Sequence, residues 1–168
     1  MAIPFQYKPG THFVYNNVGP YLAGILVQRR SGCDLVSYLT PRLFKHLGIK
    51  RSDMGDGSSW KQFLGAGGLF LTLSELHKFG LFYLNRENWN GKQILSEKWI
   101  EESTAASDTD NYGYLFWRGE YNSYRADGKY SQISMILPDK NAVISMVAEC
   151  RNGEELMSAL YDLVCAKL

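Results

Sequence analysis

The 168-residue sequence predicts an α+β fold in which helices come first and an antiparallel sheet with a C-terminal helix follows. Three observations predict it. Up to about residue 107, apolar residues recur at the three- and four-residue spacing of helices with one buried face. After about residue 108, this spacing gives way to the two-residue alternation of strands. A last stripe at helical spacing then requires a helix that packs on the sheet.

The first predicted helix follows a short apolar approach at residues 13–15. Asn16 or Asn17 can cap its N-terminus, and Pro20 falls in the first turn, where its missing N–H costs little. Gly32 is a natural residue to end this helix. One buried face is expected, made of Val18, Tyr21, Leu22, Ile25 and Leu26.

Two short helices are predicted next. Asp34 opens the first of them, which runs through Leu39. Thr40-Pro41 is expected to restart the chain as N-cap and first residue of the second helix, which Gly48 ends. Residues 50–64 have no regular pattern, so they are expected to be irregular.

Two capping signals predict the other helices of the first part. Thr72-Leu73-Ser74-Glu75 has the pattern of a capping box and starts a helix through about Leu84. Ser96 is expected to cap a helix that contains Trp99 and Ile100. The inward face of the earlier helix is expected to hold Leu73, Leu76, Phe79, Gly80 and Tyr83.

Four stretches predict the sheet, namely Tyr112 to Arg118, Tyr121 to Ala126, Tyr130 to Leu137 and Ala142 to Ala148. In the third, Ile133, Met135 and Leu137 share one face, and a hairpin loop follows at residues 138–141. Gly153 precedes the last helix. Its apolar stripe is expected to consist of Leu156, Leu160, Leu163 and Val164.

The composition narrows the classes of function. A formal charge of +1, from 18 basic and 17 acidic residues, gives no electrostatic reason to expect nucleic acid or a membrane surface as a partner. No apolar stretch approaches the roughly 18 residues of a membrane span. The cysteines Cys33, Cys150 and Cys165 lack metal-ligand spacing, so neither zinc nor a disulfide framework is expected, and no cofactor is predicted. They fit reducing, cytoplasmic surroundings, while an exported parent protein stays open.

Seven short segments carry a resemblance to a known family. They are Lys8-Pro9-Gly10, Tyr15-Asn16-Asn17, Leu43-Phe44-Lys45-His46-Leu47-Gly48, Gly65-Ala66-Gly67-Gly68-Leu69, Tyr112-Gly113-Tyr114, Gly128-Lys129-Tyr130-Ser131-Gln132 and Pro138. In this order, and over nearly the whole chain, they resemble the class C β-lactamase and penicillin-binding-protein-like serine hydrolases. The resemblance implies a single partial domain at 1–168, the C-terminal portion of that fold. Its mainly helical part is 1–107, and its strands and last helix are 108–168.

The resemblance assigns roles to Tyr15 and Asn17. A serine hydroxyl is a poor nucleophile until a base takes its proton, and the family uses a Ser-x-x-Lys segment together with the tyrosine of a Tyr-x-Asn motif. Tyr15 would be the general base and acid, and Asn17 would orient the lysine and the substrate carbonyl. The alternative from the residues alone is that Tyr15 packs in the core and Asn17 caps a helix.

The third family motif falls on Ala126-Asp127-Gly128. By resemblance, Gly128 lets substrate approach the strand, and the N–H of Lys129 would donate to an oxyanion. Alanine replaces the usual basic residue, which removes a charge for a β-lactam carboxylate and favours an esterase, amidase or peptidase. Alternatively, Gly128 is only a turn glycine between two strands.

No serine precedes Tyr15 in this sequence, so the nucleophile of the family is expected to be missing. Ser58-Ser59-Trp60-Lys61 does match Ser-x-x-Lys, but on the order of one such match is expected by chance, and it follows Tyr15 within a glycine-rich stretch. We interpret it as a surface loop. The chain is therefore expected to be part of an acyl-enzyme hydrolase for an amide, ester or lactam, and inactive alone. The alternative is a non-catalytic module that binds peptidoglycan-like peptides.

Other candidates carry less. His12, His46 and His77 have no carboxylate pattern that completes a triad, and Tyr112 and Trp117 line either a substrate groove or the core. In the family, two strands from the N-terminal part pair beside the last strand of the sheet. Without them, residues 142–148 would be an open edge, covered by a homodimer or by an N-terminal fragment. The substrate of the intact protein is expected to be a small molecule or a peptide.

Overall fold

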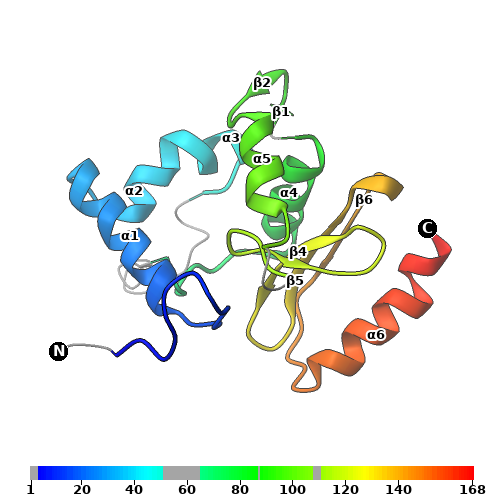
Figure 1. Ribbon diagram of the computed structural model, residues 1–168. Helices are drawn as coiled ribbons and strands as arrows, with labels where there is room; N and C mark the ends of the chain where they lie inside the picture. Colours follow the sequence, from blue (N-terminus) through cyan, green and yellow to red (C-terminus); the bar gives the residue numbers. More distant parts are fainter. Residues whose placement is uncertain (1–3, 51–64, 87, 108–110) are drawn as a thin grey trace.

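The computed structural model describes residues 4–50, 65–86, 88–107 and 111–168. Figure 1 shows the first helices on one side of the molecule and the sheet with the last helix on the other. The predicted α+β class is confirmed, with helices followed by a four-stranded antiparallel sheet and a C-terminal helix.

Helix α1 (Val18–Ser31) begins and ends as the sequence predicts. The Asn16 side chain accepts hydrogen bonds from the N–H groups of Val18 and Gly19, at 2.9 and 3.2 Å. Gly32 ends the helix in the left-handed conformation with φ of 72°, and its N–H donates to the Gln28 carbonyl.

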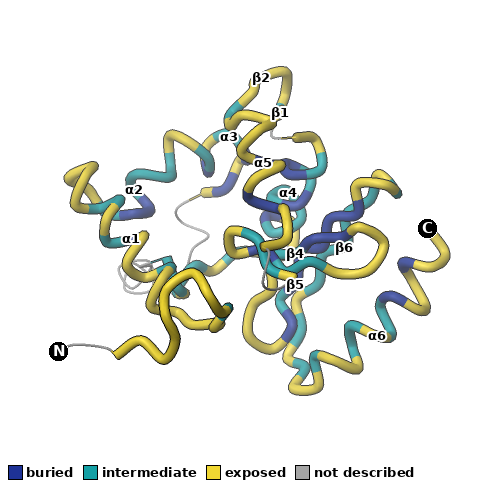
Figure 2. The backbone as a smooth tube through the Cα atoms, viewed as in Figure 1, coloured by how far each residue is buried: buried dark blue, intermediate teal, exposed yellow. Residues whose placement is uncertain are grey.

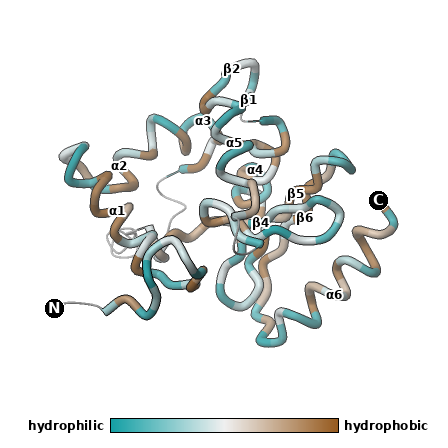
Figure 3. The backbone as a smooth tube through the Cα atoms, viewed as in Figure 1, coloured by the Kyte–Doolittle hydropathy of each residue, from teal (hydrophilic) through white to brown (hydrophobic). Residues whose placement is uncertain are grey.

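The predicted buried face of α1 is wrong. Val18 and Tyr21 are exposed, and Leu22 and Leu26 are 53% and 60% exposed. Figure 3 shows apolar residues along this helix, whereas Figure 2 shows much of it exposed. The physical reason is that, among the described residues, α1 packs chiefly on the short helix α2 (Leu35–Leu39), which is too small to cover an apolar face.

The expected restart at Thr40-Pro41 is also wrong. Asp34 caps α2, accepting from the Ser37 N–H at 2.8 Å, but the chain continues from α2 through a π-helical turn, η1 (Thr40–Phe44), into α3 (Lys45–Leu47). Pro41 has no N–H to donate, and the wider turn lets the Lys45 N–H reach the Thr40 carbonyl. The Thr40 hydroxyl donates to the Val36 carbonyl at 2.7 Å instead of capping. Gly48, with φ of 66°, ends α3 as predicted.

Helix α4 (Leu73–Leu84) confirms the predicted capping box. The Glu75 N–H donates to the Thr72 hydroxyl at 3.3 Å, and the Thr72 N–H donates to the Glu75 carboxylate at 2.9 Å. Its inward face differs in part from the prediction. Gly80 and Tyr83 are buried as expected, but Leu73, in the first turn, is half exposed, while Phe82 is the most deeply buried side chain of the helix.

We expect Thr72→Ala to lower the free energy of unfolding by about 0.5 to 2 kcal/mol, because it leaves the Glu75 N–H without its capping oxygen. Urea unfolding measures the change. Ser74→Ala, an exposed position on the same first turn, is the matched control and should stay within about 0.5 kcal/mol. Equal losses from both substitutions would contradict a specific cap.

A small hairpin and helix α5 (Glu97–Thr104) follow α4. Strands β1 (Asn88–Trp89) and β2 (Lys92–Gln93) pair across a turn, where Asn90 and Gly91 have φ of 51° and 79°. Ser96 caps α5 as predicted, accepting from the Trp99 N–H at 3.2 Å.

The main sheet has the order β3-β4-β5-β6, with each neighbouring pair antiparallel. All four strands are shorter than predicted or shifted, and Tyr112 joins the sheet only through an isolated bridge opposite Trp117. The hairpin between the last two strands contains the 3-10 turn η4 (Pro138–Lys140). The strands are β3 (Trp117–Arg118), β4 (Tyr124–Gly128), β5 (Gln132–Leu137) and β6 (Ala142–Met146).

Helices cover both faces of this sheet. Ile136, Tyr124 and Phe82 belong to one core cluster on the α4 side. On the other face, Ile133, Met135 and Leu137 pack with α6 (Gly153–Leu163), as their alternation predicts. Among the described residues, β6 pairs with β5 alone and its outer edge is open.

The predicted stripe of α6 is rotated by about one residue. Leu160 packs against the sheet, but Leu163 and Val164 are exposed, and the side chains that face the sheet are Met157, Tyr161 and Cys165. Cys165 lies in the 3-10 turn η5 (Cys165–Lys167), which follows the end of α6 and turns this residue inward. The unbranched Met157 and the long ring of Tyr161 reach the sheet together with Leu160, and this leaves Leu163 and Val164 on the outer side.

Candidate active site

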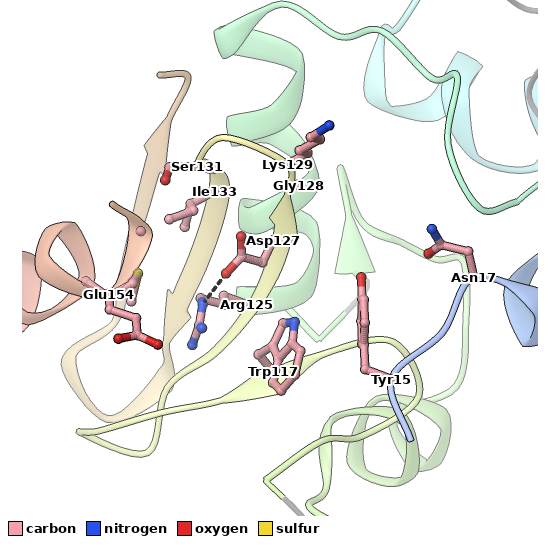
Figure 4. A pocket seen from close by; sticks show the side chains of 12 residues that line it. Tyr15, Asn17, Trp117, Arg125, Asp127, Gly128, Lys129, Ser131, Ile133 and Glu154 are labelled. Atoms are coloured by element: carbon pink, nitrogen blue, oxygen red, sulfur yellow. Dashed lines mark hydrogen bonds and ion pairs between the residues drawn. The ribbon is translucent and has the colours of Figure 1, made fainter. Parts of the chain in front are cut away.

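A cavity of about 660 Å³ lies at the end of strand β4, where the segment before α1 meets the sheet (Figure 4). The four residues predicted for the site, Tyr15, Asn17, Gly128 and Lys129, all line it. The first pair comes from the segment that enters α1, and the second pair comes from the end of β4. The fold therefore brings together two motifs that lie far apart in the sequence.

Tyr15 and Asn17 are free for a role in the cavity because Asn16 does the capping. The Asn16 amide donates to the Val14 carbonyl at 2.8 Å, while its oxygen caps α1. Asn17 makes no side-chain capping hydrogen bond, and Tyr15 is 55% exposed. The alternative interpretation, a core tyrosine beside a capping asparagine, is therefore wrong for both residues.

Gly128 ends β4 and precedes a tight turn. It pairs with Gln132, and the Ser131 N–H donates to its carbonyl at 3.2 Å. Within this turn the positive φ angles are at Tyr130 and Ser131, so the turn does not need a glycine at position 128. A Cβ there would lie 3.2 Å from the Gln132 side chain, and its absence keeps the backbone beside the cavity uncovered. The Lys129 N–H follows directly after the last paired residue of the strand.

Aromatic rings surround Tyr15. Its ring stacks on Trp117, with centroids 5.4 Å apart and planes 30° from parallel. Tyr112 meets Trp117 edge-on at 4.6 Å and Tyr15 edge-on at 6.0 Å. Burial, and secondly the charge of Tyr15, raise the pKa of the Tyr112 phenol, so Tyr112 stays protonated near neutral pH. Trp117 lines the 660 Å³ cavity, and Tyr112 and Trp117 both line an adjoining pocket of about 140 Å³. Of the two positions expected for these residues, the structure therefore favours a groove over the core.

An ion pair on β4 was not predicted. The Arg125 Nε donates to the Asp127 carboxylate at 2.9 Å, and the side chains are only 16% and 25% exposed (Figure 4). Both residues line the cavity, whereas Ala126 between them packs against the core cluster on the α4 side. Strand alternation could have found this pair, because residues two apart share a face. Asp127 neutralises Arg125, so Arg125 does not supply the positive charge that a basic residue at position 126 would provide.

The described part of the cavity holds no Ser-x-x-Lys pair. Ser131 lines the cavity, but residue 134, three positions later, is a serine rather than a lysine. The sequence match at residues 58–61 lies outside the described residues. His77 shares a hydrogen bond of 3.0 Å with Ser145 between α4 and β6, and neither residue lines the cavity.

The described residues also bear on metal binding and on membrane insertion. Within them, no group of three or more His, Cys, Asp or Glu side chains is placed to hold a metal ion. No helix in the described ranges is long and apolar enough to cross a membrane.

Comparisons with known proteins bear on the family and on the fold. The family model described as Beta-lactamase matches residues 1–164. A solved structure described as "Putative 6-aminohexanoate-dimer hydrolase from Bacillus anthracis" is 21% identical, with a TM-score of 0.72, over 93% of this chain and 44% of its own. An octameric penicillin-binding protein homologue from Pyrococcus abyssi is also 21% identical, with a TM-score of 0.71, over 95% of this chain and 44% of its own. At this identity the likeness shows the fold, and the chain spans less than half the length of either protein. No curated protein matches.

Proposed function

The chain belongs to the Beta-lactamase family, whose model matches residues 1–164, and we propose that it forms one side of the active site of a serine hydrolase. The observation that carries this proposal is the meeting of Tyr15 and Asn17 with Gly128 and Lys129 on one cavity. The hydrolase acylates its serine with an amide, ester or lactam and then hydrolyses the acyl-enzyme.

Each residue has a defined part in the proposed reaction. The Tyr15 proton passes to the lysine of the nucleophile segment, the resulting phenolate takes the proton of the serine, and the phenol so formed donates it to the leaving group. Asn17 orients the lysine of the nucleophile segment and the substrate carbonyl. The Lys129 N–H donates to the oxyanion, and Gly128 leaves room for the acyl group beside the strand.

A neutral ester or a linear amide is the substrate class that we favour over a β-lactam. Ala126 provides no cation for a lactam carboxylate, and Asp127 already neutralises Arg125. Lys129, the other cation among the described residues that line the cavity, extends over the Tyr130 ring at 4.8 Å. The solved structure from Bacillus anthracis is described as a "putative 6-aminohexanoate-dimer hydrolase", a title that names no lactam substrate.

We propose that the serine and lysine come from polypeptide outside these 168 residues. Two surfaces can receive it, namely the exposed apolar residues of α1 and the open edge of β6. An N-terminal fragment of the parent protein or a second copy of the chain would cover the edge, at residues 142–148. The chain matches 44% of the length of each of the two solved structures, which fits cover by an N-terminal fragment.

The isolated chain is therefore expected to give no covalent adduct with an acylating serine probe, as measured by intact-protein mass spectrometry. The matched control is Ser58→Ala, which should likewise show only its own unlabelled mass. Stoichiometric labelling that disappears in Ser58→Ala would place the nucleophile at residue 58 and contradict this proposal.

A non-catalytic binding module remains the second candidate function. It is favoured by the absence of a Ser-x-x-Lys pair from the described lining of the cavity and by Ala126 in place of a basic residue. The same probe distinguishes the two functions when it is applied to the parent protein or to the complex. An adduct on a Ser-x-x-Lys serine supports the hydrolase, whereas an unlabelled protein that binds peptidoglycan-like peptides supports the module.

A further inference from the structure

The position of Tyr15 depends on one neighbouring ring. We propose that Trp117 is a positioning residue, whose indole fixes the plane of the Tyr15 phenol and so directs its hydroxyl into the cavity. This inference rests on the proposed function, in which Tyr15 moves the proton of the nucleophile. Figure 4 shows the two rings side by side, with the Tyr15 oxygen directed toward the space between Asn17 and the end of β4.

Neither secondary structure nor burial holds Tyr15 in place. Residues 12–16 belong to no helix or strand, and α1 begins only at Val18. More than half of the Tyr15 surface is exposed, so packing on all sides does not fix its ring. The ring contacts with Trp117 and Tyr112 are therefore the interactions that can set its orientation.

Trp117, in contrast, is fixed by the sheet. It lies in β3, where it pairs with Arg125 of β4. The Tyr112 ring meets the Trp117 ring edge-on, and the backbone of Tyr112 pairs with that of Trp117 through an isolated antiparallel bridge. Phe13 packs on Tyr112 at 4.9 Å, which ties the segment before Tyr15 to the same cluster. The sheet thus fixes the Trp117 indole, and the indole in turn restricts the orientation of the Tyr15 phenol.

This arrangement distinguishes positioning from substrate contact. Tyr15 occupies one face of the Trp117 indole, so a substrate cannot contact Trp117 on that face. Proton transfer requires the two oxygens to lie within hydrogen-bond reach, and a displacement of about 1 Å can lower a rate by roughly 10²-fold. Tyr112 supports the cluster through its edge-on contacts with both Trp117 and Tyr15.

The test uses the full 168-residue chain labelled with 3-fluorotyrosine and observed by ¹⁹F NMR. The Tyr15 signal is the one that is lost in Tyr15→Phe. In Trp117→Leu we expect this signal to narrow and to move toward the value of free fluorotyrosine, because stacking is lost. Trp117→Phe should restore most of the original shift, since a ring remains. Trp99→Leu, at an exposed tryptophan that contacts Tyr114, should leave the signal unchanged.

A Tyr15 signal that stays in place in Trp117→Leu overturns the inference, whatever the activity. Folding of each variant is checked by urea unfolding. If Trp117→Leu unfolds, Trp117→Phe carries the test, because its smaller ring should still shift the Tyr15 signal part of the way, and an unchanged signal then overturns the inference. In the parent protein or complex, Trp117→Leu should lower kcat by about 10²-fold with little change in KM. A full rate in Tyr15→Phe would overturn the proposed function, even if the NMR result upholds the contact between the two rings.

Discussion

Replacing Tyr15 by phenylalanine is expected to slow acylation by about 10²- to 10⁴-fold in the hydrolase that contains this chain. The substitution keeps the ring that stacks on Trp117 and removes only the hydroxyl that moves the proton. The loss should fall on kcat, because proton transfer stabilises the transition state and not the bound substrate. Stability should hardly change, since more than half of the Tyr15 surface is exposed.

Stopped-flow or steady-state hydrolysis of an activated ester measures this effect, with Tyr7→Phe as the matched control. Tyr7 is an exposed tyrosine of the same N-terminal segment, stacked on His12 at 4.2 Å and outside the cavity. Its substitution should leave the rate unchanged. If Tyr15→Phe acylates as fast as Tyr7→Phe, another group must take the proton of the serine, and the proposed role of Tyr15 is wrong.

The features that the sequence predicts well depend on interactions between neighbouring residues. The capping box at Thr72, the caps at Asp34 and Ser96, and the left-handed ends at Gly32 and Gly48 all form within one or two turns of backbone. Such interactions depend little on the rest of the fold, so residue type and spacing predict them.

The errors have a different origin, because they concern what each element packs against. Leu22 and Leu26 have helical spacing, but spacing does not say whether a partner covers them. On α6, Leu163 and Val164 are exposed, and Met157 and Tyr161 face the sheet instead. At Pro41 the sequence indicates a break, and a π turn absorbs the missing N–H instead. The first two outcomes depend on long-range packing, whereas the π turn is a local adjustment of the backbone around Pro41.

The candidate site divides in the same way. The order of the motifs indicates Tyr15, Asn17, Gly128 and Lys129, and the structure places all four on one cavity. The stacking of Tyr15 on Trp117 could not be predicted, because it depends on how the segment before α1 meets the sheet. Their roles in catalysis stay predictions until the substitutions are measured.

The largest loss of stability is expected from Phe82→Ala, at about 3 to 5 kcal/mol. Phe82 is 1% exposed and belongs to the cluster that joins Phe44 and Leu47 of the helical part to Tyr124 and Ile136 of the sheet. Removing its ring leaves a cavity at the junction of the two parts, where neighbouring side chains can only partly relax. The same junction sets the position of β4, whose end carries Gly128, relative to the first helices.

Phe70→Ala is the matched control, because Phe70 is 58% exposed and the substitution removes the same atoms. Its free energy of unfolding should stay within about 0.5 kcal/mol of the parent chain in urea. Equal losses at the two positions would mean that Phe70 is buried in solution, as it would be if a second copy of the chain covered it. If Phe82→Ala lowers the free energy of unfolding only slightly, the helical part and the sheet unfold separately. In that case the cavity between them would depend on the added polypeptide for its shape.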